Sequence, residues 1–339
     1  MTGPGDEIGV GGRIQHGGNL ARARALFPQA PEPWIDLSTG INPHSYPHSP
    51  IPGNAFARLP EPALAQELKA TAANAYGAPS AAHVAAGPGT QILLPIVAGL
   101  IGGRKAAVLF PTYAEHARAA KMAGFDVSET DDLSRLSEAD LAVIVNPNNP
   151  TGRIVQKEDL LALADAMRAK GGLLVVDEAF MDVSEAKSVA DAVDQGGLVV
   201  LRSFGKFYGM AGLRLGFAIT CPDIVQRIED RLGPWAVSGP ALHVAGEALA
   251  DEEWQRSRRQ KLKKDAARLD ALLAETGIPV VGGTALFRFI RDPKASALFR
   301  HLGERGIITR RFEERPDDLR IGLPGENDWV RLEEALKTI

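Results

Sequence analysis

The chain has 339 residues, 45% of them hydrophobic and 24% charged, which is typical of a globular protein with a sizeable core. Its net charge is -4 and its pI is near 6.0, so electrostatics do not favour binding to nucleic acid or to an anionic membrane. A single cysteine, Cys221, excludes an internal disulfide. With no apolar run of membrane-spanning length and no signal-peptide pattern, the sequence predicts a cytoplasmic protein. No metal site is predicted.

Residues 28–62 are rich in Pro, Gly and Ser, which indicates an ordered arm or loop. From residue 63, helical and apolar segments alternate. Helices are predicted at 63–76, 89–101, 115–123 and 157–170, and strands at 106–110, 141–145, 173–176, 198–201 and 215–219. Because the strands are apolar on both faces, we expect a parallel or mostly parallel sheet covered by helices on both sides.

The pattern changes after residue 234. A long charged helix is predicted at 254–275, and strands at 279–290 and 319–323 are expected around a helix at 294–305. This order indicates a second, α+β domain. The predicted division is an N-terminal arm and part of the small domain at 1–45, a large domain at 46–235 and a small C-terminal domain at 236–339.

Candidate chemical groups follow the predicted strands, and ligands of such sheets bind at the carboxyl ends of strands. Asn149 and Asp177 follow two strands, and Lys206 follows a third. A lysine with a lowered pKa can form a Schiff base with an aldehyde, although a solvated loop lysine is the common alternative. A buried Asp177 requires a cationic partner, for which a protonated pyridine nitrogen is suitable.

Two further motifs are less specific. Gly87-Pro88-Gly89-Thr90-Gln91 opens a predicted helix, where backbone N–H groups suit a phosphate, although a plain helix start has the same pattern. Tyr113 follows a strand and either stacks on a planar heterocycle or is an ordinary boundary aromatic.

Taken in order, Asn146-Pro147-Asn148-Asn149-Pro150-Thr151-Gly152, Asp177-Glu178-Ala179, Ser203-Phe204-Gly205-Lys206 and Gly212-Leu213-Arg214-Leu215-Gly216 resemble the motifs of fold-type-I pyridoxal-phosphate enzymes. The resemblance implies an α/β fold with a large, mostly parallel sheet domain and a smaller α+β domain. It implies pyridoxal 5'-phosphate bound to Lys206, with Asp177 on the pyridine nitrogen, Asn149 on the ring oxygen and Tyr113 stacked on the ring. It also implies a substrate carboxylate at Arg320. The implied ligands of the cofactor phosphate are Gly89, Thr90, Ser203 and Arg214.

The N-terminal segment is similar to a narrower family. His16-Gly17-Gly18-Asn19 and Asp36-Leu37-Ser38-Thr39-Gly40-Ile41-Asn42-Pro43 look like the threonine-phosphate decarboxylases of cobalamin biosynthesis, relatives of histidinol-phosphate aminotransferases. This resemblance implies decarboxylation of L-threonine O-3-phosphate to (R)-1-amino-2-propanol O-2-phosphate. It implies substrate binding by His16 and Asn42, and a homodimer in which Tyr46 reaches the cofactor phosphate of the neighbouring subunit.

An arginine near the substrate phosphate is also implied, and of the adjacent Arg310 and Arg311 we choose Arg310. One departure from the pattern of many aminotransferases is Phe180, where a tyrosine hydroxyl would bond the ring oxygen. Two alternatives remain open. Histidinol-phosphate or related transamination would use the same residues. A catalytically silent, ligand-binding relative is the other, although the retained Lys206 and Asp177 argue against it.

Overall fold

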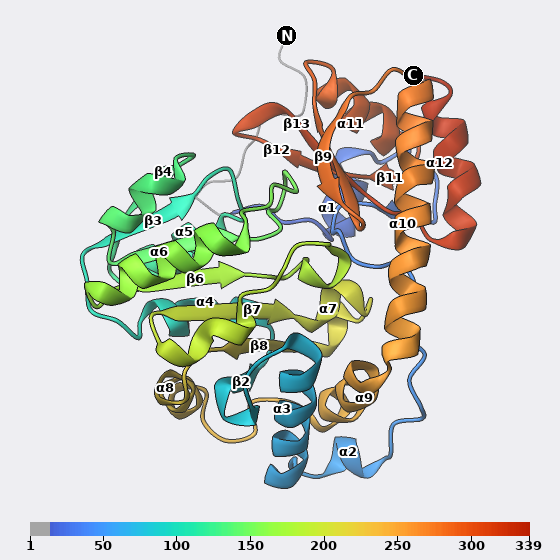
Figure 1. Ribbon diagram of the computed structural model, residues 1–339. Coiled ribbons are helices and arrows are strands. Elements are labelled where there is room, and N and C mark those ends of the chain that lie inside the picture. Colours follow the sequence, from blue (N-terminus) through green and yellow to red (C-terminus); the bar gives the residue numbers. More distant parts are fainter. Residues whose placement is uncertain (1–13) are drawn as a thin grey trace. The chain divides into compact units, whose positions relative to one another are not determined.

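The computed structural model describes residues 14–339, so the Gly-rich N-terminus that lacks a signal-peptide pattern lies outside the described residues. The chain forms two compact units (Figure 1). Unit 1 combines the chain up to Pro43 with Lys263–Ile339, and unit 2 is His44–Leu262. Within the described range, none of the helices has both the length and the apolar character needed to cross a membrane.

Unit 2 is built on a seven-stranded sheet of order β2-β8-β7-β6-β5-β3-β4. All neighbouring strands pair in parallel except β8, which is antiparallel to both β2 and β7. The predicted mostly parallel sheet is therefore confirmed. The strands are β2 (Val84–Gly87), β3 (Lys105–Leu109), β4 (Asp126–Thr130), β5 (Leu141–Val145), β6 (Leu173–Asp177), β7 (Leu198–Ser203) and β8 (Gly216–Ile219).

Helices pack on both faces of this sheet. The helices of unit 2 are α2 (Asn54–Ala57), α3 (Pro62–Tyr76), α4 (Thr90–Ala98), α5 (Glu115–Met122), α6 (Lys157–Ala169), α7 (Phe204–Phe207), α8 (Pro222–Leu232), α9 (Gly239–Ala250) and the first part of α10 (Glu252–Glu275). One core joins α4, α5 and α8 to alternate strand residues such as Val143, Val175 and Val199. Because side chains alternate along a strand, the intervening residues face the opposite side.

Unit 1 has the predicted α+β composition. Its four-stranded antiparallel sheet has the order β12-β13-β10-β9, and a separate parallel pair joins β1 to β11. The strands are β1 (Ile35–Asp36), β9 (Val280–Thr284), β10 (Phe287–Arg291), β11 (Ile307–Ile308), β12 (Arg310–Phe312) and β13 (Arg315–Gly322). The helices are α1 (Leu20–Leu26), α11 (Ala295–Gly303), α12 (Trp329–Leu336) and the rest of α10.

Several elements were not predicted from the sequence, among them β2, β4, α8, α9 and α12. Strand β4 is an edge strand of the sheet, and only Thr130 of its five residues is buried, so no apolar run marks it. The sequence assigned residues 236–262 to the small domain, whereas the compact units place them with the sheet of unit 2. The physical reason is that α9 packs along α3 and buries Leu242, Val244 and Leu249.

A buried ion network lies on the sheet face opposite the core shared by α4, α5 and α8. Arg202 of β7 donates to Glu178 Oε2 at 3.0 Å and to Asp182 Oδ1 at 2.5 Å, and its guanidinium lies 4.3 Å from the centroid of the Tyr76 ring. Burial alone would lower the pKa of Arg202, but the charges of Asp182 and Glu178 outweigh it and hold that pKa above its ordinary value. The network therefore keeps its charges inside the protein by mutual neutralisation.

Replacing Arg202 by methionine is expected to destabilise the protein by about 3–5 kcal/mol, because Glu178 and Asp182 then stay buried without their cation. Urea denaturation would measure the loss. The matched control is Arg168→Met, which removes an exposed pair with Asp165 and is expected to cost about 0–1 kcal/mol. Equal losses in the two variants would contradict the prediction.

Candidate active site

Lys206 lies in a tightly packed turn directly after β7. Its neighbours Phe204, Gly205 and Phe207 are buried, and Lys206 itself is half-buried. A Cβ added at Gly205 would lie 2.7 Å from Ala211 Cα, so this approach requires glycine. The Lys206 Nζ lies 5.9 Å from the centroid of the Phe180 ring, within reach of a cation–π contact. The Phe180 position, where a tyrosine hydroxyl was expected in many relatives, thus presents an aromatic face to the amine.

Asp177 is a buried carboxylate at the end of β6, with 5% of its surface exposed. Its Oδ2 accepts a hydrogen bond from His116 Nε2 at 2.9 Å, and its Oδ1 accepts one from the Ala179 N–H at 3.0 Å. His116 lies on α5 and is 3% exposed. Two donors therefore serve the carboxylate, which satisfies the requirement for burying it.

Strand alternation separates two adjacent carboxylates. Asp177 continues the row of Leu173 and Val175, which belong to the core with α4, α5 and α8, and so it meets His116 of α5. Glu178 extends to the other side and meets Arg202. Each carboxylate consequently has its own partner. Asp177 lies on the side of the candidate site, whereas Glu178 lies on the side of the ion network.

The loop after β5 is held by two of its three asparagines. Asn146 pairs with both the N–H and the C=O of Val155, at 2.9 and 3.1 Å. Asn148 accepts from the Thr112 hydroxyl at 2.7 Å and donates to the Pro111 carbonyl at 2.8 Å. Both asparagines are fully buried, whereas Asn149 is half-buried. The arrangement assigns a structural role to the first two and leaves Asn149 as the candidate for ligand binding.

A residue of α4, Gln91, holds the Tyr113 side chain by a hydrogen bond. Its hydroxyl donates to Gln91 Oε1 at 3.1 Å, and Gln91 in turn donates to Glu115 Oε2 at 2.7 Å. The Tyr113 ring lies 6.0 Å from the His116 ring at 83°. Tyr113 therefore lies next to His116, the histidine that binds Asp177. A tyrosine that stacks on a ligand ring held at Asp177 is expected in this position.

The start of α4 is close to a cation. Gly89 has φ +86°, and a Cβ added there would lie 2.6 Å from Arg214 Nη2. A Cβ added at Gly216 would lie 2.6 Å from the Thr90 nitrogen, and Gly216 is the register partner of Ser203. Glycines thus bring a helix N-terminus, a guanidinium and two hydroxyl-bearing residues together, a combination that suits a phosphate.

Tyr46, also in unit 2, is 8% exposed. Its hydroxyl donates to Asp251 Oδ2 at 3.2 Å, and its ring packs edge-on against Trp254 at 5.1 Å. Burial, together with the hydrogen bond to Asp251, raises the pKa of Tyr46 to about 12. Its expected role toward a neighbouring subunit stays a prediction.

The substrate residues expected in unit 1 include two arginines that are direct partners across β12 and β13, Arg310 and Arg320. Directly opposite residues share one face of a sheet, whereas Arg311 points to the other face. Arg320 is 5% exposed and donates to the Ser38 carbonyl at 2.5 Å. Arg310 donates to the Gln15 carbonyl at 2.5 Å. The register thus groups Arg310, rather than Arg311, with Arg320.

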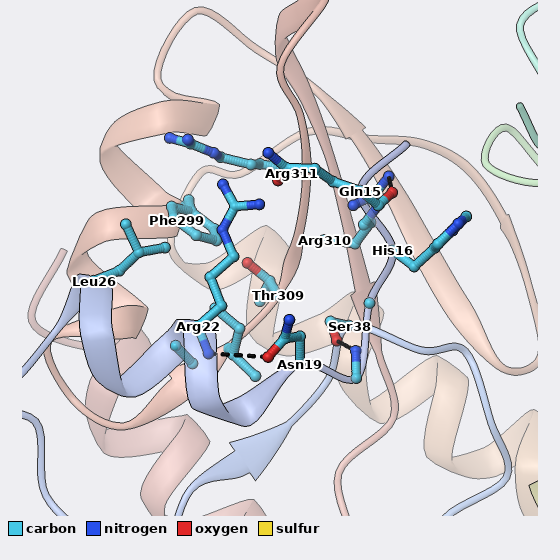
Figure 2. Close-up of a pocket in the computed structure, with 14 residues that line it drawn as sticks. Gln15, His16, Asn19, Arg22, Leu26, Ser38, Phe299, Thr309, Arg310 and Arg311 are labelled. Carbon is cyan, nitrogen blue, oxygen red and sulfur yellow. Dashed lines mark hydrogen bonds between the residues drawn. The ribbon is translucent and has the colours of Figure 1, made fainter. Parts of the chain in front are cut away.

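A pocket of unit 1 is lined by both His16 and Arg310 (Figure 2). Asn42, which is 2% exposed, and Arg320 do not line it. The structure therefore brings together His16 and Arg310 at one cavity and Arg310 and Arg320 on one sheet face. No group of His, Cys, Asp and Glu suited to a metal ion is found in the part of the chain that the structure describes.

His116 is the site residue that the sequence did not reveal. It follows Glu115 in a helix with charged neighbours, which is typical of a surface position. Its partner Asp177 lies 61 residues later in the chain, so only the fold shows the contact. The one signal in the sequence is its position three residues after Tyr113, a candidate site residue.

Comparison with known proteins gives consistent results. A threonine-phosphate decarboxylase of Pseudomonas aeruginosa is 42% identical over 327 residues, covering 95% of this chain and 97% of that protein. A histidinol-phosphate aminotransferase of Trichormus variabilis is 31% identical, covering 90% and 92%. The crystal structure of a histidinol-phosphate aminotransferase from Sinorhizobium meliloti in complex with pyridoxal-5'-phosphate has a TM-score of 0.81 at 21% identity, covering 96% of each chain.

The family described as aminotransferase class I and II matches residues 33–339, which include all of unit 2 and the strands of unit 1 but not α1. That span contains Lys206, Asp177 and the residues around them. The chain belongs to the class I and II aminotransferase family.

Proposed function

We propose that the protein is a pyridoxal-phosphate-dependent decarboxylase that converts L-threonine O-3-phosphate to (R)-1-amino-2-propanol O-2-phosphate and CO2. The observation that carries the proposal is the 42% identity, over 95% of the chain, to a threonine-phosphate decarboxylase. The register pair Arg310 and Arg320 supports it, because threonine phosphate has two anionic groups and the pair supplies two cations. By its resemblance to that family, we assign the reaction to cobalamin biosynthesis in the cytoplasm.

The residues present fit the cofactor. The cradle of Gly89, Thr90, Ser203 and Arg214 suits its phosphate, and the φ of +86° at position 89 favours glycine there, beside the Arg214 guanidinium. Asp177 would accept a hydrogen bond from the pyridine nitrogen, and Asn149 and Tyr113 would contact the ring. When bound, pyridoxal 5'-phosphate supplies an aldehyde and an electron-withdrawing ring that stabilises negative charge at Cα.

The chain's own residues then have distinct tasks. The Lys206 amine would hold the cofactor covalently and, once released by the substrate, would accept or return a proton at Nζ. Asp177 would face the ring nitrogen in a fixed orientation, because His116 and the Ala179 N–H bind its two oxygens. Arg320, in this proposal, binds the substrate carboxylate, and Arg310 with His16 binds the phosphate; Asn42 also contacts the substrate. The direction in which these groups hold the carboxylate selects which bond at Cα breaks.

The cofactor-loaded protein is expected to release CO2 from L-threonine O-3-phosphate without any added 2-oxo acid. Measurement of CO2 and of the amino alcohol phosphate tests this, and Lys206→Ala, which lacks the Schiff-base amine, is expected to lose both the visible absorbance of the lysine-bound cofactor and the CO2. Absence of CO2, together with acceptor-dependent turnover of histidinol phosphate, would instead identify an aminotransferase, the activity named for the Trichormus variabilis relative.

His116→Phe should weaken cofactor function, since Asp177 Oδ2 loses its buried donor at 2.9 Å. Loss of a hydrogen bond to a buried charged group costs about 1–3 kcal/mol, or roughly 5- to 150-fold in kcat/KM or in the Kd of the cofactor. Titration of the apoprotein with pyridoxal 5'-phosphate and steady-state kinetics measure both. His301→Phe, at a histidine of unit 1 that binds the Ala335 carbonyl, is the control, and an equal effect there would refute the assignment.

We also propose a homodimer. Unit 2 exposes Phe56 (69%), Leu59 (65%) and Trp235 (56%), and Trp235 lines one pocket together with Pro60, the neighbour of Leu59, so exposed apolar side chains gather around this segment. Sedimentation equilibrium is expected to give about twice the mass of the 36.1 kDa chain. Phe56→Asp is expected to shift the equilibrium toward monomer, whereas Met122→Asp, at a methionine of α5 that is 65% exposed, is the control. A monomeric wild-type protein would contradict the proposal.

A further inference from the structure

The pocket in Figure 2 has two sides, and the proposed substrate residues account for only one. Arg310 extends toward Gln15 next to His16. Arg311 lies on the opposite side, with its guanidinium 5.1 Å from the centroid of the Phe299 ring. Because neighbouring strand residues point to opposite faces, Arg311 cannot share the face of Arg310 and Arg320 without breaking the register.

Two guanidinium groups on the Phe299 side converge on one oxygen atom. Arg22 Nη2 lies 3.0 Å from Glu313 Oε1, and Arg311 Nη2 lies 3.4 Å from the same atom. The position of Glu313 Oε1 therefore marks a point where an anionic oxygen receives donors from both arginines. The arginine and glutamate side chains are each about a third or more exposed, so their ion pairs are individually weak.

A buried hydroxyl lines the same side. Thr309 is 3% exposed, and its Oγ1 has no hydrogen-bond partner in the structure. Thr309 lines the pocket, and Figure 2 shows its hydroxyl on the side of Arg22 and Phe299. A buried hydroxyl without a partner is costly, so an oxygen-bearing ligand in the pocket would satisfy it.

The pocket has room for such a ligand. Its volume is about 50 Å³, severalfold more than the roughly 10–15 Å³ that a single water molecule requires. On the Phe299 side the lining includes two arginines, Arg22 and Arg311, and the nearby Glu313 carboxylate pairs with both. A tetrahedral oxyanion matches both the size and the charge.

We propose that Arg22, Thr309 and Arg311 form a second anion site, which takes a phosphate group, either free or as a monoester, and that Glu313 closes it as an internal counter-ion. The site is separate from the face of Arg310 and Arg320 and does not depend on the proposed reaction. Occupation displaces the Glu313 carboxylate from both arginines. The ligand then joins α1, through Arg22, to β12, through Arg311.

The test is calorimetric titration of the full-length, cofactor-loaded protein with inorganic phosphate. Glu313→Gln is expected to tighten phosphate binding roughly 5- to 30-fold, which corresponds to release of two exposed ion pairs. Glu314→Gln is the matched control, since Glu314 lies 3.7 Å from Arg315 and is 64% exposed, and it should leave the affinity unchanged. A parallel titration with glycerol 2-phosphate distinguishes a site for monoesters from one for free phosphate only.

Adding Arg311→Gln or Arg22→Gln to Glu313→Gln is expected to remove the gain, whereas Arg300→Gln, at an exposed arginine of α11, should not. Thr309→Val in the same background should weaken binding, with circular dichroism confirming the fold of each variant. Unchanged affinity in Glu313→Gln would overturn the proposal. The proposal would also be overturned if Arg310→Gln abolished phosphate binding while variants without Arg22 and Arg311 still bound phosphate. That outcome would leave the proposed decarboxylation intact. Phosphate binding as expected without CO2 release would refute only the decarboxylase.

Discussion

The candidate site depends on the burial of two adjacent carboxyl groups at the end of one strand, each of which needs its own hydrogen-bonding partner. Asp177 and Glu178 leave β6 on opposite faces, and each face supplies a different partner. Arg202 neutralises Glu178 and Asp182 on one side, and His116 binds Asp177 on the other. If one carboxylate lacked its partner, its burial would cost several kcal/mol.

The same alternation organises β7. Arg202 belongs to the face of the ion network, and Ser203 to the face of α4, where Gly89 and Thr90 lie. Lys206 is the third residue of α7, which begins directly after Ser203. Because Arg202 and Ser203 of β7 belong to two different polar sites, a shift of this strand by one residue would remove both side chains from their sites. The register of β6 with β7 therefore positions Asp177, Ser203 and the buried ion network together.

The sequence predicted most of the sheet of unit 2, because its inner strands are continuous apolar runs with polar residues at their ends. It did not predict β4, whose exposed polar residues resemble a loop, or α9, whose place beside α3 is a tertiary contact. Lys206, Asp177 and Asn149 were identifiable because they follow strands in specific motifs. His116 and Arg202 were not, because each acquires its role from a residue distant in the chain.

The hairpin of β12 and β13 has a consequence for how such proteins can diverge. Strand β12 has only three residues, and its pairing with β13 shifts after Arg311. Deletion or insertion of one residue in the Glu313-Glu314 turn would exchange the faces of Arg310 and Arg311 without altering either side chain. Because both side chains are arginines, each face would keep a guanidinium, so the hairpin can change length by one residue without losing a cation from either face.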